Sequence, residues 1–61
     1  MHSLPIRIRK ARSAAQLTQA ELARRIGVKR SAATQWEHPL GTSPSMHHLI
    51  QIAIEIGRAH V

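Results

Sequence analysis

The sequence predicts a single all-α domain that spans residues 1–61. Three observations support this fold class: apolar residues recur at helical spacing in four segments, Gly27 separates two of these segments, and the turn-forming run HPLGTSP precedes the last one. The predicted helices cover residues 4–15, 19–26, 30–37 and 46–56. A chain of this length forms one small domain, and its core must be aliphatic because Trp36 is the single aromatic residue among Phe, Trp and Tyr.

The first predicted helix carries one apolar stripe. Its members follow one another at steps of four, three and four residues, which places them on one side of a helix: Leu4, Ile8, Ala11 and Ala15. Pro5 suits the first turn, where a helix does not use the backbone N–H that proline lacks. Arg7, Arg9 and Lys10 lie off the stripe, and the pattern leaves open whether they face only solvent or also a phosphate backbone.

Residues 19–38 are predicted to form two short helices joined by a turn. Thr18 and Glu21 form a T-x-x-E capping box, which predicts that a helix begins at Gln19. Gly27 predicts the end of that helix, because glycine adopts the left-handed conformation without a steric penalty. A second helix follows from residue 30. This is the helix-turn-helix pattern, in which the second helix enters the major groove of DNA.

The predicted helix at residues 30–37 has two unlike faces. On a helical wheel Ala32, Ala33 and Trp36 fall within roughly 100° of one another, so Trp36 is expected in the core. The other face carries side chains that hydrogen-bond to base edges, and base contacts are therefore expected from Arg30, Ser31, Thr34 and Gln35. Lys29 stands at the cap position without a capping side chain, and it is either a DNA contact or a surface lysine.

The last predicted helix is apolar over an unusually wide arc. Ser45 is a good N-cap for a helix from Met46 to Ile56, and Gly57 is expected to end it. The apolar positions of this helix span roughly 200° of the wheel, which is more than a helix on the surface of a domain needs. The surplus lies at Ile50 and Ile54, which therefore need a further partner.

Composition points to a polyanionic partner and away from catalysis. The formal net charge is +6, and the acids are Glu21, Glu37 and Glu55 alone. Nucleic acid is the first candidate partner and an acidic membrane surface the second. There is no Asp and no Cys, and the glutamates lie on three different predicted helices, so no enzyme activity and no cofactor are expected. His47 and His48 are adjacent in a helix and point about 100° apart, so no metal site is predicted.

The same sequence features favour a location inside the cell. No apolar run approaches the ~20 residues that span a membrane, and the run MHSLPIRIRK at the N-terminus has no apolar core of a signal peptide. A cytoplasmic protein, associated with the nucleoid when it is bound to DNA, is therefore expected.

Several runs resemble the Cro and lambda-repressor-like family of DNA-binding proteins, also called the XRE family. The resemblance rests on LTQAELA from Leu17, on Gly27-Val28, on Gln35-Trp36-Glu37, and on the later positions Pro44-Ser45, Leu49, Ile52-Ala53 and Ile56-Gly57. It covers about residues 4–57. It implies a lambda-repressor-like fold of four to five short helices that binds double-stranded DNA sequence-specifically as a transcriptional regulator, with repressors of the phage or prophage type as the nearest functional class.

The resemblance also implies roles for individual residues. The residues expected at DNA phosphates are Arg12, Thr18, Gln19 and Lys29. An ion pair between Arg12 and Glu37 is expected to tie the first helix to the third, so that the structural residues are Arg12, Gly27, Trp36 and Glu37. Gln16 stands where the family often has glycine, which implies a less favourable backbone conformation there. Residues 58–61 are too few for the fifth helix that the family normally has, so we expect either a homodimer on a palindromic operator or a longer natural chain.

Two other functions compete with a free-standing repressor. An antitoxin of a toxin–antitoxin pair uses the same DNA-binding fold and adds a surface for its cognate toxin. A basic module that binds RNA or a membrane surface would explain the charge. The glycine-hinged pair of helices and the two-faced helix at residues 30–37 argue against this last function.

Overall fold

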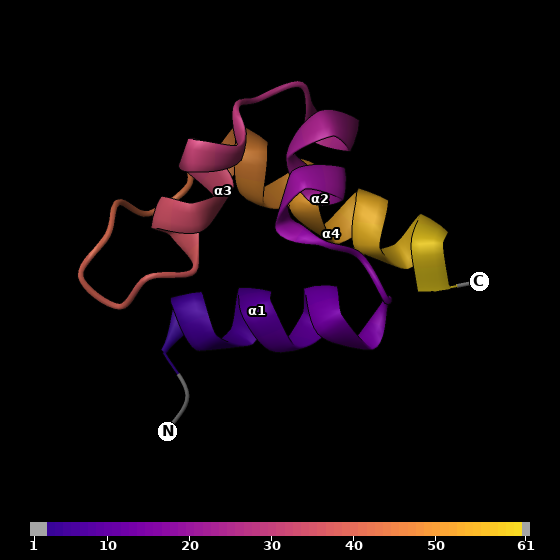
Figure 1. The fold of residues 1–61 in the computed structure, drawn as a ribbon, viewed down its shortest axis with the longest axis horizontal. Coiled ribbons are helices and arrows are strands. Elements are labelled where there is room, and N and C mark those ends of the chain that lie inside the picture. Colours follow the sequence, from indigo (N-terminus) through magenta and orange to yellow (C-terminus); the bar gives the residue numbers. More distant parts are fainter. Residues whose placement is uncertain (1–2, 61) are drawn as a thin grey trace.

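A computed structural model describes residues 3–60 of the protein. Within these residues the chain forms four helices and no strand: α1 (Leu4–Ala14), α2 (Gln19–Ile26), α3 (Arg30–Trp36) and α4 (Met46–His60). The predicted all-α, lambda-repressor-like fold class is confirmed. In Figure 1, α1 runs along one side of the molecule, α2 and α3 lie above it, and α4 passes behind them. The long connection between α3 and α4 projects from the left side of this view.

Helix α1 is held to the rest of the domain mainly by its middle and its end. Ile8 and Ala15 are buried, as the apolar stripe predicts, whereas Leu4 at the start of the stripe remains 36% exposed. The helix ends one residue before its predicted boundary because the backbone of Ala15 already leaves the helical region. Gln16 then adopts a φ of 60°, the left-handed conformation that the resemblance to a glycine position implied.

The turn between α2 and α3 follows the local signals in the sequence. The backbone N–H of Glu21 donates to Thr18 Oγ1 at 3.0 Å, and the Glu21 carboxylate accepts from the Thr18 N–H at 2.9 Å. The predicted capping box is therefore confirmed. Gly27 has a φ of 87° and ends α2 as predicted. Helix α3 begins at Arg30 after Lys29, whose side chain makes no capping hydrogen bond.

Two small apolar clusters form the core between the helices. The first cluster contains buried residues from all four helices, namely Ile8, Ala23, Ala33, Trp36 and Ile52. The second lies beside the bend after α1 and contains Ala15, Leu17 and Leu22. Trp36 is 4% exposed, so its predicted place in the core is confirmed. Because Ala33 and Trp36 face inward, the opposite side of α3 faces solvent.

Helix α4 begins as predicted but does not end at Gly57, so the predicted boundary at residue 56 is wrong. Its first turn is capped by Ser45, whose Oγ accepts from the His48 N–H at 3.2 Å. The helix continues through Gly57 to His60. Two contacts favour the extra turn: Ala59 packs against the second core cluster, and Arg58 pairs with Glu55 at 3.2 Å. Glycine inside a helix costs only about 1 kcal/mol relative to alanine, so these contacts can offset the cost of continuing the helix through Gly57.

None of the helices within residues 3–60 has the length and apolar character needed to cross a membrane.

Candidate nucleic-acid interface

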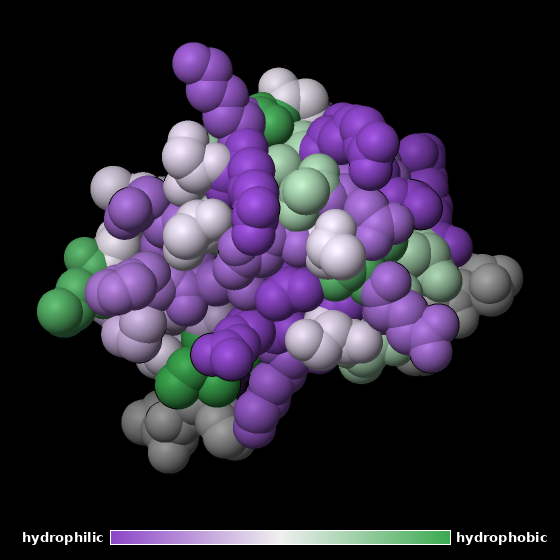
Figure 2. All heavy atoms as spheres, in the orientation of Figure 1, coloured by the Kyte–Doolittle hydropathy of each residue, from purple (hydrophilic) through white to green (hydrophobic). Residues whose placement is uncertain are grey.

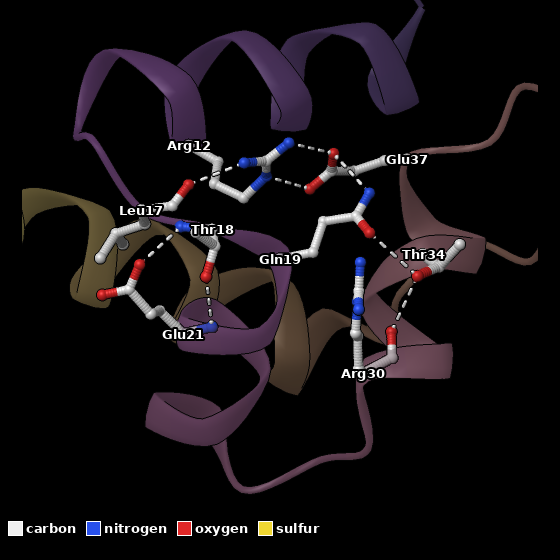
Figure 3. A network of polar contacts seen from close by, with 8 residues as sticks. All are labelled: Arg12, Leu17, Thr18, Gln19, Glu21, Arg30, Thr34 and Glu37. Atoms are coloured by element: carbon white, nitrogen blue, oxygen red, sulfur yellow. Dashed lines mark hydrogen bonds and ion pairs between the residues drawn. The ribbon is translucent and has the colours of Figure 1, made fainter.

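A buried ion pair joins α1 to the end of α3. Arg12 Nε lies 2.6 Å from Glu37 Oε2, and Arg12 Nη2 donates to Glu37 Oε1 at 2.9 Å (Figure 3). The remaining nitrogen, Nη1, donates to the carbonyl oxygen of Leu17 at 2.7 Å. The side chain of Glu37 is 3% exposed and that of Arg12 is 13% exposed. The predicted pair is present, and its two parallel hydrogen bonds fix the position of the end of α3 relative to α1.

Gln19 extends this network from the start of α2 to the solvent side of α3. Its Nε2 donates to Glu37 Oε1 at 3.2 Å, and its Oε1 accepts from the Thr34 hydroxyl at 3.0 Å (Figure 3). The amide has a second N–H, which neither of these bonds uses. Gln19 is therefore held between two neighbours while it keeps one donor for an external acceptor.

The residues expected to contact bases lie together on the exposed side of α3. All four are exposed: Arg30, Ser31, Thr34 and Gln35. Lys29, one residue before the helix, is exposed as well. Hydrophilic residues cover most of the face seen in Figure 2, over the region where α2 and α3 lie in Figure 1. Within the described residues, neither Lys29 nor Arg30 forms an ion pair, so their positive charges remain available to a ligand.

Each glutamate in the chain already has a role inside the protein. Glu37 pairs with Arg12, Glu55 lies 3.9 Å from Arg25 and 3.2 Å from Arg58, and Glu21 caps α2. The backbone N–H of Thr18 lowers the pKa of Glu21, and the side chain of Thr18 and the charges of Arg24 and Arg25 lower it further. Because these carboxylates are engaged elsewhere, none of them opposes an anion at the exposed face of α3.

A polar pocket of about 310 Å³ opens where α1, the start of α2 and the end of α3 meet. Its lining contains one acid, Glu37, which is paired with Arg12; the full set is Arg9, Arg12, Gln19, Thr34, Glu37, His38 and Pro39. The N-terminus of α2 carries backbone N–H groups that favour anions, as does the positive end of the helix dipole. Thr18 uses its oxygen as an acceptor for the cap and keeps its hydroxyl proton for another partner. Of the four residues predicted at phosphates, Arg12 and Gln19 line this pocket, whereas Thr18 and Lys29 do not.

The connection after α3 folds back on the helix in a way that the sequence did not predict. The N–H of His38 donates to the carbonyl oxygen of Gln35 at 3.2 Å, and Gly41 N–H donates to the His38 carbonyl oxygen at 2.8 Å. A side chain at Gly41 would overlap the backbone carbonyl oxygen of Gln35. Gly41 thus allows the connection to pass close to the backbone of Gln35, a predicted base contact. In the sequence, the one indication of this close approach is a glycine shortly after the end of the helix.

The histidines form no metal-binding cluster in the part of the chain that the structure describes. Instead the ring of His48 lies 5.2 Å from that of Trp36, measured between centroids, and His47 lies 5.8 Å from His48. His48 therefore packs against the core, at the junction between the end of α3 and the start of α4.

The fold and the two-faced α3 define a helix-turn-helix protein. The sequence matches a model of the helix-turn-helix family over residues 8–60, and the chain belongs to the Cro and lambda-repressor-like, or XRE, family. This is a family of DNA-binding transcription regulators rather than of enzymes. No curated protein and no solved structure was found to match the chain.

Proposed function

We propose that this protein is a repressor that binds one preferred duplex DNA sequence, with α3 in the major groove. The observation that carries this proposal is the exposed row of Arg30, Ser31, Thr34 and Gln35 on a helix whose other side is fixed by Trp36 and Glu37. Arginine pairs well with guanine O6 and N7, and glutamine with adenine N6 and N7. A short helix held this rigidly can present such groups without reordering its backbone.

Phosphate contacts on both sides of α3 would set the position of the domain on the duplex. Lys29 precedes the helix and forms no ion pair, while Gln19 has a free N–H beside the start of α2. Thr18 can donate its hydroxyl proton from the same helix start. Arg12 uses three of its five N–H groups within the protein, so a phosphate contact from Arg12 would use the remaining two.

Selection from a pool of random duplexes tests the proposal. We expect a short sequence to be enriched, and the affinity for it to fall steeply as salt rises, because phosphate contacts release counterions. Affinity for the selected duplex and for a scrambled duplex would then be measured by fluorescence anisotropy at several salt concentrations. Equal affinity for both duplexes at every salt concentration would contradict sequence-specific binding.

The proposed location of the protein is the cytoplasm, where it would have direct access to DNA.

The exposed part of α4 supports a homodimer as the form that binds DNA. Met46 is 70% exposed, Ile50 53% and Ile54 47%, and exposed apolar side chains of this size commonly mark an interface. Two copies that each carry a charge of +6 repel one another, and a DNA duplex between them would offset that repulsion. Two-fold symmetry would place two α3 helices about 34–36 Å apart on a palindromic site. Sedimentation with and without a palindromic duplex measures this, and one protein per duplex would exclude the dimer.

The same exposed apolar side chains favour a second candidate function, that of an antitoxin. A cognate toxin would then cover Ile50 and Ile54 in place of a second copy of the chain. Co-purification with the product of a neighbouring toxin gene, lost on substitution of Ile50 and Ile54 by serine, would support the antitoxin. Dimerisation that these substitutions abolish would support the repressor.

A further inference from the structure

The hydroxyl proton of Thr34 is used within the protein. Thr34 Oγ1 lies 3.0 Å from Gln19 Oε1 and 3.1 Å from the carbonyl oxygen of Arg30, one turn earlier in α3. Both neighbours are acceptors, and a hydroxyl group has one proton to donate. Whichever of the two oxygens accepts that proton, Thr34 keeps no donor for a base.

The ion pair behind Gln19 decides which way these bonds run. Glu37 is paired with Arg12, so its carboxylate can only accept hydrogen bonds. The Gln19 atom that lies 3.2 Å from it must therefore be the amide nitrogen, and the amide oxygen must face Thr34. The reverse orientation would bring two oxygens together at Glu37. The carboxylate of Glu37 thus fixes the orientation of the Gln19 amide, which presents an acceptor to Thr34.

What remains of Thr34 for a ligand is its methyl group and the lone pairs of its oxygen. Figure 3 shows the hydroxyl turned toward Gln19 and the Arg30 carbonyl, with the methyl group on the side away from them. Thr34 is exposed, on the same face of α3 as Arg30 and Gln35. Of the groups that bases display in the major groove, the 5-methyl group of thymine is the one that suits an apolar contact with a threonine methyl.

We infer that Thr34 is a specificity-determining residue that reads the 5-methyl group of a thymine by apolar contact, and not by donating a hydrogen bond. This inference rests on the proposed function, since it requires α3 to lie in the major groove. It assigns two kinds of chemistry to residues on the same exposed face of α3. Arg30 and Gln35 supply hydrogen bonds to bases, while Thr34 discriminates by the presence or absence of one methyl group.

The test compares thymine with deoxyuridine, which pairs identically but lacks the methyl group. Each thymine of the selected duplex would be replaced singly by deoxyuridine, and Kd measured for the wild-type protein and two variants. Thr34→Val keeps a methyl group in place and removes the hydroxyl, whereas Thr34→Ser does the reverse. We expect one thymine in each half-site at which the wild type loses about fourfold in affinity, which is roughly the worth of one buried methyl group. Thr34→Val should keep this ratio and Thr34→Ser should bind the two duplexes equally.

The ratio of the two affinities is measured within each variant, so a general loss of binding or of stability cancels. A thymine-to-deoxyuridine ratio that Thr34→Ser leaves unchanged would overturn the inference, because another residue would then read the methyl group. Loss of the ratio in Thr34→Val would overturn it as well, because the hydroxyl would then be the reading group. Absence of any methyl effect in the wild type would overturn this inference alone. Failure to bind any selected duplex would overturn it together with the proposed function.

Discussion

The carboxylate of Glu37 accepts hydrogen bonds from Arg12 at both of its oxygens and thereby fastens the end of α3 to α1. The same carboxylate holds Gln19, which in turn holds Thr34. One buried acid thus lies behind both the start of α2 and the exposed face of α3. The same ion pair therefore joins α1 to the end of α3 and, through Gln19, is linked to the proposed reading residue Thr34.

Removal of one partner of this pair should strongly destabilise the protein. Arg12→Ala leaves a buried carboxylate without its cation, a change that commonly costs about 3–5 kcal/mol of unfolding free energy. Thermal or urea denaturation of the two single variants and of the double variant with Glu37→Ala measures the coupling. We expect the double variant to be much less destabilised than the sum of the singles. Arg9→Ala is the control, because Arg9 is an exposed arginine on the same helix. Additive effects of the Arg12 and Glu37 substitutions would contradict the coupling.

Stability should fall in acid partly through Glu21. The Thr18 N–H lowers the pKa of this carboxyl from its ordinary value of 4.5, so the folded state binds its proton less readily than the unfolded state does. The stability that the charged form contributes is therefore complete above pH 4.5 and is lost as the pH falls through the lowered pKa of the folded state. Glu21→Gln keeps the shape of the capping box without the charge. The melting temperatures of wild type and variant, followed by circular dichroism, should differ at pH 7 and converge in strong acid. A constant difference at every pH would contradict the prediction.

Gly57→Ala should stabilise the protein by about 1 kcal/mol, because alanine is the better helix former in the interior of a helix. Gly57 lies inside α4, and apart from the adjacent residues and the backbone of its own helix a Cβ atom there would meet no heavy atom within 4 Å. Gly27→Ala is the matched control. It also adds a methyl group in open space, but at a φ of 87°, so it should destabilise the protein. Chemical denaturation of both variants measures the two effects, and a loss of stability in Gly57→Ala would mean that α4 ends before this residue.

The features that could be predicted from the sequence are those that act within a few residues. The capping box at Thr18, the end of α2 at Gly27 and the cap at Ser45 each depend on a local pattern, and the structure contains all three. The burial of Trp36 follows from the wheel of one helix. Gly57 shows the limit of such signals, because contacts of Ala59 with a distant part of the core extend the helix past it.

The features that could not be predicted depend on how helices meet. Arg12 and Glu37 lie 25 residues apart, and only the family resemblance suggested their pairing. The bond between Gln19 and Thr34 needs the start of α2 to lie beside the middle of α3, which no local pattern encodes. Periodicity predicted the exposed row of side chains on α3. It could not predict that the hydroxyl proton of one member of the row, Thr34, is already used in a hydrogen bond within the protein.

Gln35→Ala should weaken binding to the preferred duplex by about 1–3 kcal/mol and leave binding to a scrambled duplex nearly unchanged. The reason is that a glutamine that reads a base contributes only where that base is present. Lys29→Ala is the comparison, since loss of a phosphate contact weakens all sequences alike and reduces the slope of affinity against salt. Anisotropy titrations with both duplexes measure the two cases. Equal losses for Gln35→Ala on the two duplexes would make Gln35 a backbone contact.

Gly41→Ala should weaken sequence-specific DNA binding, although residue 41 lies outside α3. A Cβ atom at residue 41 would overlap the backbone carbonyl oxygen of Gln35, so either the connection or the end of α3 must move. Forced shifts of this kind cost about 1–3 kcal/mol. Ser43→Ala, in the exposed part of the same connection, is the control and should have little effect.

Thermal denaturation would measure the loss of stability, and titration of the preferred and scrambled duplexes would measure the preference for the specific sequence. If the end of α3 moves, Gly41→Ala should lose affinity mainly for the preferred duplex, as Gln35→Ala does. A fully stable Gly41→Ala would contradict the close contact with Gln35, whereas a destabilised variant with unchanged preference would mean that the connection yields and α3 stays in place.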